Sequence, residues 1–451
     1  MKVRSICLGC KVNTYESEFI ISKFLEKGYE ISDIDPDIIV INTCSVTNQA
    51  DSKGRKIINR CRRENPNSII VIMGCMIESI KRNCEISQKE NKDNNNNSIY
   101  NNDYFGANIV IGNKDKSKVV ELVEEYINKK ESNDIYKQGK FIRLYPDFDR
   151  EFEDMTIERM EGRTRAFVKI QDGCQNFCSY CIIPYTRGKC RSKDFNKVVT
   201  ECETLVKNGY KEIVLTGIHT GHYGEDTNVT FSSLLDRIAK IPGLERIRIS
   251  SIEITELGED FLNVLKNNSN IVDHIHIPLQ AGSDHILEMM NRKYRRDYFK
   301  NKIEEIRRIR PNISITTDII VGFPGETEED FLDTINFSKE IGFTKIHVFP
   351  YSRRKGTIAD TLPNQIDEKI KKERVERLIQ VSDLLENKYF DSFIGSNKKV
   401  LIETNDLVSI GHTDNYLKVK IMEILNKNTI YDVIIKSRDG KVLIGEINGK
   451  M

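Results

Sequence analysis

Three cysteines stand close together in the stretch GCQNFCSYC, at residues 173–181. Cys174, Cys178 and Cys181 have the spacing C-x3-C-x2-C, in a loop directly after an expected strand. Three thiolates on one short loop can bind three irons of a cubane cluster and leave the fourth iron open. An open iron can chelate S-adenosylmethionine through its amino and carboxylate groups and pass an electron to its sulfonium. The spacing therefore predicts a redox cluster with one free corner.

Two aromatic residues and a further cysteine accompany this loop. Phe177 and Tyr180 lie inside it, where we expect them to limit water at the cluster and tune its potential. The alternative is a zinc knuckle, since structural zinc takes four protein ligands and Cys190 follows nearby. A short loop at the end of a barrel strand fits an open cluster better, so Cys190 is expected to be a bystander.

A second set of cysteines is spread over the first 75 residues. Cys10, Cys44 and Cys75 each follow a different apolar run, in ICLGC, IVINTC and VIMGC. The carboxyl ends of parallel strands share one edge of a sheet, where ligands collect. The three thiols are therefore expected to share a second cluster, again with one iron unligated. The remaining cysteines are interpreted as small buried or idle thiols: Cys7, Cys61, Cys84 and Cys202.

The bulk properties are those of a folded, multidomain chain. It has 451 residues, 39% hydrophobic and 30% charged, which predicts two to four domains. Eleven cysteines, an odd number, argue against a disulfide framework in a chain of this length. The formal net charge of +1 gives no general argument for nucleic acid. No apolar run is long enough to span a membrane and no signal peptide is evident, so we expect a cytoplasmic location without membrane contact.

The elements that must position the first domain alternate between strand and helix. The expected strands are 2–8, 38–42, 69–73 and 108–112, and the expected helices are 15–27, 48–64 and 115–130. Continuous apolar strands between helices indicate a parallel sheet covered on both faces. This predicts an α/β domain over 1–135, with an Asn-rich solvated insertion at 87–103, followed by a linker over 136–160.

Two further regions follow the linker. Six strands alternate with helices and predict a partial (β/α)6 barrel, which with a long charged helix at 364–391 makes a domain over 161–390. The expected strands are 165–171, 212–216, 246–250, 274–279, 314–321 and 345–350. Short strands after Gly395 predict a small antiparallel β-barrel over 391–451, a shape that often holds single-stranded nucleic acid.

These motifs together resemble the methylthiotransferase family of radical S-adenosylmethionine enzymes, over nearly the whole chain. LGCKVNTYES (8–17), INTCSVT (41–47) and MGC (73–75) resemble the amino-terminal domain of that family. The radical core is matched by 163–193, 274–294 and 316–331, and the end of the chain resembles its RNA-binding TRAM-like barrel. The LGCKVN opening is similar to the branch that acts on threonylcarbamoyladenosine. The branches for isopentenyladenosine and for a ribosomal protein aspartate usually open as YGCQMN and LGCPKN.

The resemblance implies an activity, cofactors and partners. The cofactors would be two [4Fe-4S] clusters and S-adenosylmethionine, which serves as radical source and methyl donor. The reaction would place a methylthio group on adenine C2 at position 37, in the tRNA anticodon loop. A reducing electron donor protein and a sulfur donor would be partners. Adenine C2 is unactivated, so a cofactor radical supplies what acid–base chemistry cannot. The rival from another class is a metal-stabilised RNA-binding protein without turnover.

Polar residues at later strand ends are candidates for the S-adenosylmethionine pocket. They are Thr216, Gly217, Ser251 beside Ser250, and Gln280; the alternative is that they only cap backbone groups. Ala281 departs from the serine common in the family. Basic residues are candidates for phosphate contacts, against the alternative of a solvated charge run. These residues are Arg187, Lys189, Arg191, Lys193, Arg292, Lys293, Arg295 and Arg296.

Overall fold

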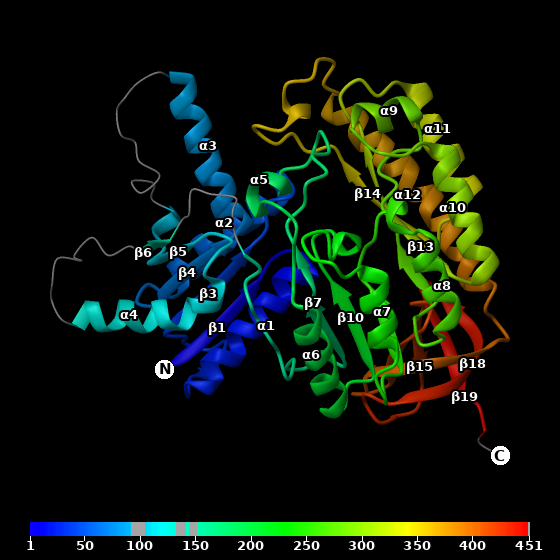
Figure 1. Ribbon diagram of the computed structural model, residues 1–451, viewed down its shortest axis with the longest axis horizontal. Helices are drawn as coiled ribbons and strands as arrows, with labels where there is room; N and C mark the ends of the chain where they lie inside the picture. Colours follow the sequence, from blue (N-terminus) through cyan, green and yellow to red (C-terminus); the bar gives the residue numbers. More distant parts are fainter. Residues whose placement is uncertain (92–103, 132–140, 144–150, 450–451) are drawn as a thin grey trace. The chain divides into compact units, whose positions relative to one another are not determined.

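The structure is a computed structural model that describes residues 1–91, 104–131, 141–143 and 151–449. It divides into two compact units, each built from separated stretches of chain (Figure 1). Unit 1 consists of Met1–Arg159, Gln171–Lys193 and Ser352–Thr361. Unit 2 consists of Met160–Ile170, Asp194–Tyr351 and Leu362–Met451.

Unit 1 is built on a six-stranded parallel sheet with the order β2-β1-β3-β4-β5-β6. The two central strands are buried along their whole length, as the unbroken apolar runs predict. The strands are β1 (Lys2–Cys7), β2 (Glu30–Ile31), β3 (Ile38–Thr43), β4 (Ile69–Gly74), β5 (Ile109–Ile111) and β6 (Phe141–Arg143).

Helices follow the strands of this sheet and bury its faces. Ile39, Ile41, Ile70 and Ile72 alternate along β3 and β4 and pack against apolar residues of α2 and α3, including Cys61. Helix α2 begins at the Thr47 cap, whose side chain accepts a hydrogen bond from the backbone N–H of Ala50. The helices are α1 (Lys11–Glu26), α2 (Asn48–Glu64), α3 (Cys75–Asn91) and α4 (Val119–Glu131), with short turns η2 (Tyr104–Gly106) and η3 (Lys116–Lys118).

Two later stretches of chain complete unit 1. Residues 171–193 form an antiparallel pair, β8 with β9, joined through a loop and the short helix α5. Residues 352–361 dock through Arg354, which donates hydrogen bonds to Ser45 and Asp51. The elements are β8 (Gln171–Asp172), α5 (Ile183–Arg187), β9 (Arg191–Ser192) and η6 (Ile358–Asp360).

Unit 2 contains six parallel strands in two sheets, β7-β10-β11 and β12-β13-β14. The sheets are linked by a parallel bridge between Ile247 and Ile271, which gives the open barrel that the sequence predicts. The strands are β7 (Arg165–Lys169), β10 (Glu212–Thr216), β11 (Arg246–Ile249), β12 (His274–His276), β13 (Ser314–Val321) and β14 (Lys345–Pro350).

Helices cover the outer side of these strands, and α10, α11 and α12 lie outside β13 and β14 in Figure 1. The longer helices are α6 (Phe195–Lys207), α7 (Phe231–Ala239), α8 (Glu259–Asn267), α9 (Asp284–Met289), α10 (Arg296–Ile309), α11 (Glu328–Ile341) and α12 (Glu368–Asp391). The short turns are η4 (Thr220–His222) and η5 (Ile254–Glu256).

The end of unit 2 is a closed barrel with the order β15-β16-β17-β19-β18. Val400, Val419 and Val433 are among its fully buried core residues. Arg246 of β11 holds the barrel by donating to the carbonyl oxygens of Lys399 and His412, at 2.7 and 3.0 Å. The strands are β15 (Asn397–Thr404), β16 (Ser409–Thr413), β17 (Lys418–Ile421), β18 (Ile430–Asp439) and β19 (Val442–Ile447).

The predicted fold class is confirmed in its three parts: a parallel α/β sheet, a partial barrel and a small closed β-barrel. Most of the Asn-rich insertion at 87–103 lies outside the described residues, as do 136–140 and 144–150 of the linker predicted at 136–160. The predicted domain boundaries stay a prediction. Within the described ranges, no helix is both long enough and apolar enough to cross a membrane.

Candidate metal centre

Cys10, Cys44 and Cys75 lie at the carboxyl edge of three adjacent strands of unit 1. Thr43 of β3 pairs with Gly74 of β4, so Cys44 and Cys75 each stand one residue beyond a paired position. Cys10 follows β1, the neighbour of β3 on its other side. The predicted convergence of three thiols at one sheet edge is what these strands produce.

Two glycines allow the chain to turn in front of these cysteines. Gly9 and Gly74 have φ values of +119° and +102°, a region that L side chains rarely adopt. A Cβ at Gly9 would lie 2.7 Å from Cys44 Cβ, and a Cβ at Gly74 would lie 2.6 Å from the carbonyl oxygen of Thr43. Glycine before Cys10 and before Cys75 therefore lets these strand ends lie close to the end of β3, where Thr43 precedes Cys44.

The thiols are near enough to affect one another. Burial raises the pKa of Cys44 to about 12, and the neighbouring thiol of Cys75 adds to this rise. The chain alone therefore keeps Cys44 protonated at neutral pH, and iron binding would replace that proton. Three soft sulfur donors from separate strands would suit three of the four irons of a cubane cluster, one sulfur for each iron.

Polar groups surround Cys75 and point at its sulfur. The side chain of Arg187 donates from Nε to Cys75 Sγ at 3.4 Å, and Asn113 donates from Nδ2 to the same sulfur at 3.5 Å. Asn113 also donates to the carbonyl oxygen of Thr186, at 2.9 Å. Two N–H donors on one sulfur suit a thiolate that binds iron.

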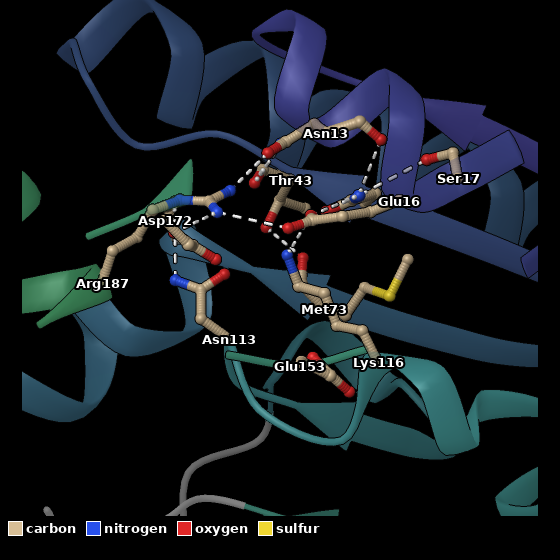
Figure 2. Close-up of polar contacts among 12 residues, drawn as sticks. Asn13, Glu16, Ser17, Thr43, Met73, Asn113, Lys116, Glu153, Asp172 and Arg187 are labelled. Carbon is tan, nitrogen blue, oxygen red and sulfur yellow. Dashed lines mark hydrogen bonds and ion pairs between the residues drawn. The ribbon is translucent and has the colours of Figure 1, made fainter. Parts of the chain in front are cut away.

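Arg187 is completely buried and belongs to a network of charges with α1 (Figure 2). Its guanidinium contacts Asn13 Oδ1 at 2.7 Å, Asp172 Oδ1 at 3.0 Å and Glu16 Oε1 at 3.2 Å. Lys116 Nζ contacts the other oxygen of Glu16, at 2.5 Å. Burial lowers the pKa of Arg187, but the negative charges of Cys75 and then of Asp172 raise it well above its ordinary value. The guanidinium is therefore a permanent cation inside unit 1.

The second cysteine loop also lies in unit 1. Cys174, Cys178 and Cys181 are half-buried, and backbone hydrogen bonds fix the loop at both ends. Cys174 N donates to the carbonyl oxygen of Gly188 at 3.0 Å, and Cys181 N donates to that of Cys178 at 2.9 Å. The three thiols on this short loop fit a cubane with an open iron.

The accompanying residues of this loop are placed as follows. Phe177 has a φ of +45°, is 43% exposed and packs edge-on against Tyr185. Tyr180 is half-buried. Cys190 is buried, with its Sγ facing the carbonyl oxygen of Gly173 at 3.8 Å. The roles predicted for Phe177 and Tyr180 stay predictions.

The residues expected around S-adenosylmethionine lie at strand ends of unit 2. Thr216 is the buried last residue of β10, followed by Gly217, and Ser251 comes after β11. Gln280 has a φ of +69°, and its backbone pairs with β13 by donating to Asp318 O and accepting from Ile320 N, both at 2.8 Å. This pairing does not involve the side chain of Gln280, so the pocket role and the capping alternative both stay predictions.

The phosphate contacts expected of the basic residues are wrong for half of them. Arg187, Arg191 and Lys193 are at most 7% exposed and have partners inside unit 1. Arg292 is 7% exposed and pairs with Glu253. Buried, paired cations cannot face a phosphate backbone. Four residues are exposed or half-exposed and remain candidates: Lys189, Lys293, Arg295 and Arg296.

Sequence reasoning missed several polar residues around the sulfurs. Asn13, Glu16 and Ser17 are buried on one face of α1, at the i, i+3, i+4 spacing of a helix. Asn113 follows β5 as the cysteines follow their strands. A polar helix face directly after Cys10, and a polar residue at a fourth strand end, were signals present in the sequence.

Comparison with known proteins identifies related sequences and a related fold. Residues 168–338 match the model described as the radical SAM superfamily, and residues 2–94 match the uncharacterized protein family UPF0004. The structure of the radical S-adenosylmethionine methyltransferase TsrM from Kitasatospora setae superposes on 77% of this chain, over 72% of the TsrM chain. Its TM-score is 0.53 at 14% sequence identity, which shows a shared fold. The chain is a radical S-adenosylmethionine enzyme.

Relatives over the full length define the family more narrowly. The threonylcarbamoyladenosine tRNA methylthiotransferase MtaB of Bacillus subtilis is 40% identical over 422 residues, which cover 91% of this chain and 88% of the relative. The protein of the same name from Aquifex aeolicus is 36% identical, and the match covers 93% of this chain and 96% of the relative. The tRNA-2-methylthio-N(6)-dimethylallyladenosine synthase of Acetivibrio thermocellus is 33% identical, and the match covers 91% of this chain and 84% of the relative. The chain belongs to the radical S-adenosylmethionine methylthiotransferase family.

Proposed function

We propose that the protein converts N6-threonylcarbamoyladenosine at position 37 of tRNA to its 2-methylthio derivative. The observation that carries this proposal is the presence of two cysteine triads in one compact unit of a chain 40% identical to an MtaB methylthiotransferase. A metal-stabilised protein that only bound RNA would be expected to hold zinc with four protein ligands at each site rather than three. A tRNA substrate agrees with the predicted cytoplasmic location.

The residues divide the work between the two cysteine sets. Cys174, Cys178 and Cys181 would hold the [4Fe-4S] cluster that binds S-adenosylmethionine, and Cys10, Cys44 and Cys75 would hold the second one. When bound, the clusters and S-adenosylmethionine supply the electron, the radical and the methylated sulfur that the reaction needs. An electron donor protein and a sulfur donor would renew what each turnover consumes.

The side chains around the triads would orient the sulfur ligands, bind S-adenosylmethionine and exclude water. Arg187 and Asn113 hold the sulfur of Cys75 through N–H groups. Phe177 would limit water beside the loop. Thr216 and Gly217 are predicted to meet the methionyl amino group of S-adenosylmethionine, and Gln280 is predicted to line its pocket. The reacting base must leave the stack of the anticodon loop to be reached.

The experiment that tests the proposal is turnover with matched tRNA substrates. Reconstituted enzyme is incubated with S-adenosylmethionine, reductant and sulfide, with tRNA that is threonylcarbamoylated, isopentenylated or unmodified at position 37. Nucleoside mass spectrometry should find the methylthio product only from the first tRNA. A product only from isopentenylated tRNA would select the other tRNA branch, and no product from any tRNA would reject the function.

Cysteine variants test the assignment of the triads. Cys75→Ser and Cys178→Ser should each lose about half of the bound iron, since each removes a ligand of one of two four-iron clusters. Cys61→Ser is the matched control, because Cys61 is equally buried but belongs to the apolar core between α2, α3 and the sheet. Full iron content in Cys75→Ser would reject the assignment of that triad.

A further inference from the structure

Arg187 belongs to the same segment as the Cys174 loop and donates a hydrogen bond to the Cys75 thiol, within unit 1. We propose that Arg187, together with Asn113, raises the reduction potential of the cluster held by Cys10, Cys44 and Cys75 by donating hydrogen bonds to the Cys75 sulfur. The proposal rests on the ligand assignment of the proposed function. It concerns positioning and tuning, and it gives Arg187 no contact with substrate.

The first argument is the geometry of the donors. Arg187 Nε and Asn113 Nδ2 approach Cys75 Sγ at 3.4 and 3.5 Å, so two N–H groups of different strength share one sulfur. Hydrogen bonds to the sulfurs, net charge and solvent exposure are the terms that set the potential of an iron–sulfur cluster. One-electron reduction adds negative charge that the sulfurs share, so N–H donors stabilise the reduced state more than the oxidised state.

The second argument is that the guanidinium cannot turn away. Its remaining nitrogens are held by Asn13 at 2.7 Å, by Asp172 at 3.0 Å and by Glu16 at 3.2 Å. The side chain is 0% exposed, so no water competes for its N–H groups. A rigid planar fork that is buried and has a partner at each of its three nitrogens keeps the donor aimed at sulfur in both redox states.

The third argument is local charge. The buried cations Arg187, Lys116 and Arg191 lie with two buried carboxylates, Glu16 and Asp172. Glu78 is a third buried carboxylate in this region and accepts a hydrogen bond from the backbone N–H of Asn113 at 2.8 Å. The named cations and carboxylates therefore balance before any thiolate is counted. Buried charge is weakly screened, so the guanidinium that contacts the Cys75 sulfur directly favours a thiolate-ligated cluster that gains an electron.

The position of Arg187 in the chain gives this tuning a purpose. Arg187 ends α5, which begins two residues after Cys181, and its partner Asp172 stands two residues before Cys174. The same short segment therefore carries one cysteine triad and the donor to the other. For an electron donor that serves both clusters, Arg187 would bring the potential of the second cluster within reach.

The test measures potential rather than activity. The full-length chain carrying Cys174→Ala, Cys178→Ala and Cys181→Ala is reconstituted, so that only one cluster forms. Its midpoint potential is then measured by dithionite titration with EPR detection. Arg187→Gln should make reduction at least tenfold less favourable, a fall of about 59 mV or more for one electron. Arg187→Lys keeps the positive charge but not the planar guanidinium, and should lower the midpoint potential by less than Arg187→Gln does.

A matched variant separates the sulfur contact from general charge. Arg191→Gln removes a buried cation from the same segment that pairs with Asp172 rather than with sulfur, and should change the equilibrium less than threefold. Resonance Raman in D2O gives an independent readout. The Fe–S(Cys) band should shift on deuteration in the unsubstituted Arg187 background and shift less in Arg187→Gln.

The outcomes distinguish the inference from the function it rests on. If the triple-alanine chain binds no four-iron cluster, or keeps it when Cys75 is also replaced, the ligand assignment fails. If Arg187→Gln binds the full cluster but shows an unchanged potential, or the same shift as Arg191→Gln, the inference fails while the assignment stands. If Arg187→Gln cannot bind iron, Arg187→Lys decides: an unchanged potential in that variant together with an unchanged deuterium shift overturns the proposal.

Discussion

Glu16 is the residue whose removal tests the buried charge network most directly. It is 1% exposed and lies between Lys116 at 2.5 Å and Arg187 at 3.2 Å. With an effective dielectric constant of about 20, Coulomb's law gives gross attractions of roughly 7 and 5 kcal/mol. Desolvation of the three ions cancels much of this, and breaking a buried pair costs about 3–5 kcal/mol in practice. We expect Glu16→Gln to destabilise unit 1 by about 3–5 kcal/mol, because Lys116 is left without its anion.

The assay must report on unit 1 alone, because a chain with two compact units need not unfold in one step. Native-state hydrogen exchange of peptides from α1 gives that local free energy. The double variant Glu16→Gln with Lys116→Met removes one charge of each sign, and should recover at least half of the loss. A loss below about 1 kcal/mol in Glu16→Gln, or a double variant no more stable than the single one, would refute the electrostatic reasoning.

Three further outcomes follow from other parts of the molecule. Gly74→Ala should lower the free energy of unfolding by about 1–3 kcal/mol and the iron content by up to half, because φ is +102° and the added Cβ meets backbone atoms. An iron content equal to that of the wild type would contradict this. Arg246→Met should cost about 2–3 kcal/mol and speed amide exchange in β15 and β16, since two carbonyl acceptors lose a charged donor; unchanged exchange would speak against that link. Burial raises the pKa of Glu256, but hydrogen bonds from His219 and His222 outweigh it and lower the value to about 2, so its contribution to stability is present above about pH 4.5 and lost as the pH falls towards 2. Urea midpoints of Glu256→Gln should therefore lack that acid-range slope, and an identical slope in both proteins would disprove the assignment.

The elements were predictable where burial makes a long, uniform pattern. Helix α2 spans the predicted 48–64. The strands β10 and β13 have the predicted bounds because they are the middle strands of their sheets and are almost wholly buried. The edge strand β14 also has the predicted bounds, although it is only partly buried. The strands β2 (Glu30–Ile31) and β6 (Phe141–Arg143) were missed. Strands of two or three residues at a sheet edge carry too few side chains to show any period.

The candidate site was predictable only in its sulfurs. Cysteines directly after apolar runs show their place at a sheet edge without any knowledge of distant contacts. Arg187 was wrongly assigned to the surface because its neighbours in TRGKCRSK are basic. Its real partners include Glu16, 171 residues away in the chain. No local pattern reports a pairing across such a distance, and basic residues are exposed in most proteins.

The composition of unit 1 from three separated stretches has a consequence for biosynthesis. Arg354, which bonds Ser45 and Asp51 beside Cys44, belongs to the last of those stretches, 352–361. A ribosome must therefore make most of the polypeptide before the earliest cysteines gain their final surroundings. The iron that these thiols are proposed to bind would therefore be delivered late, after most of the chain has been synthesised.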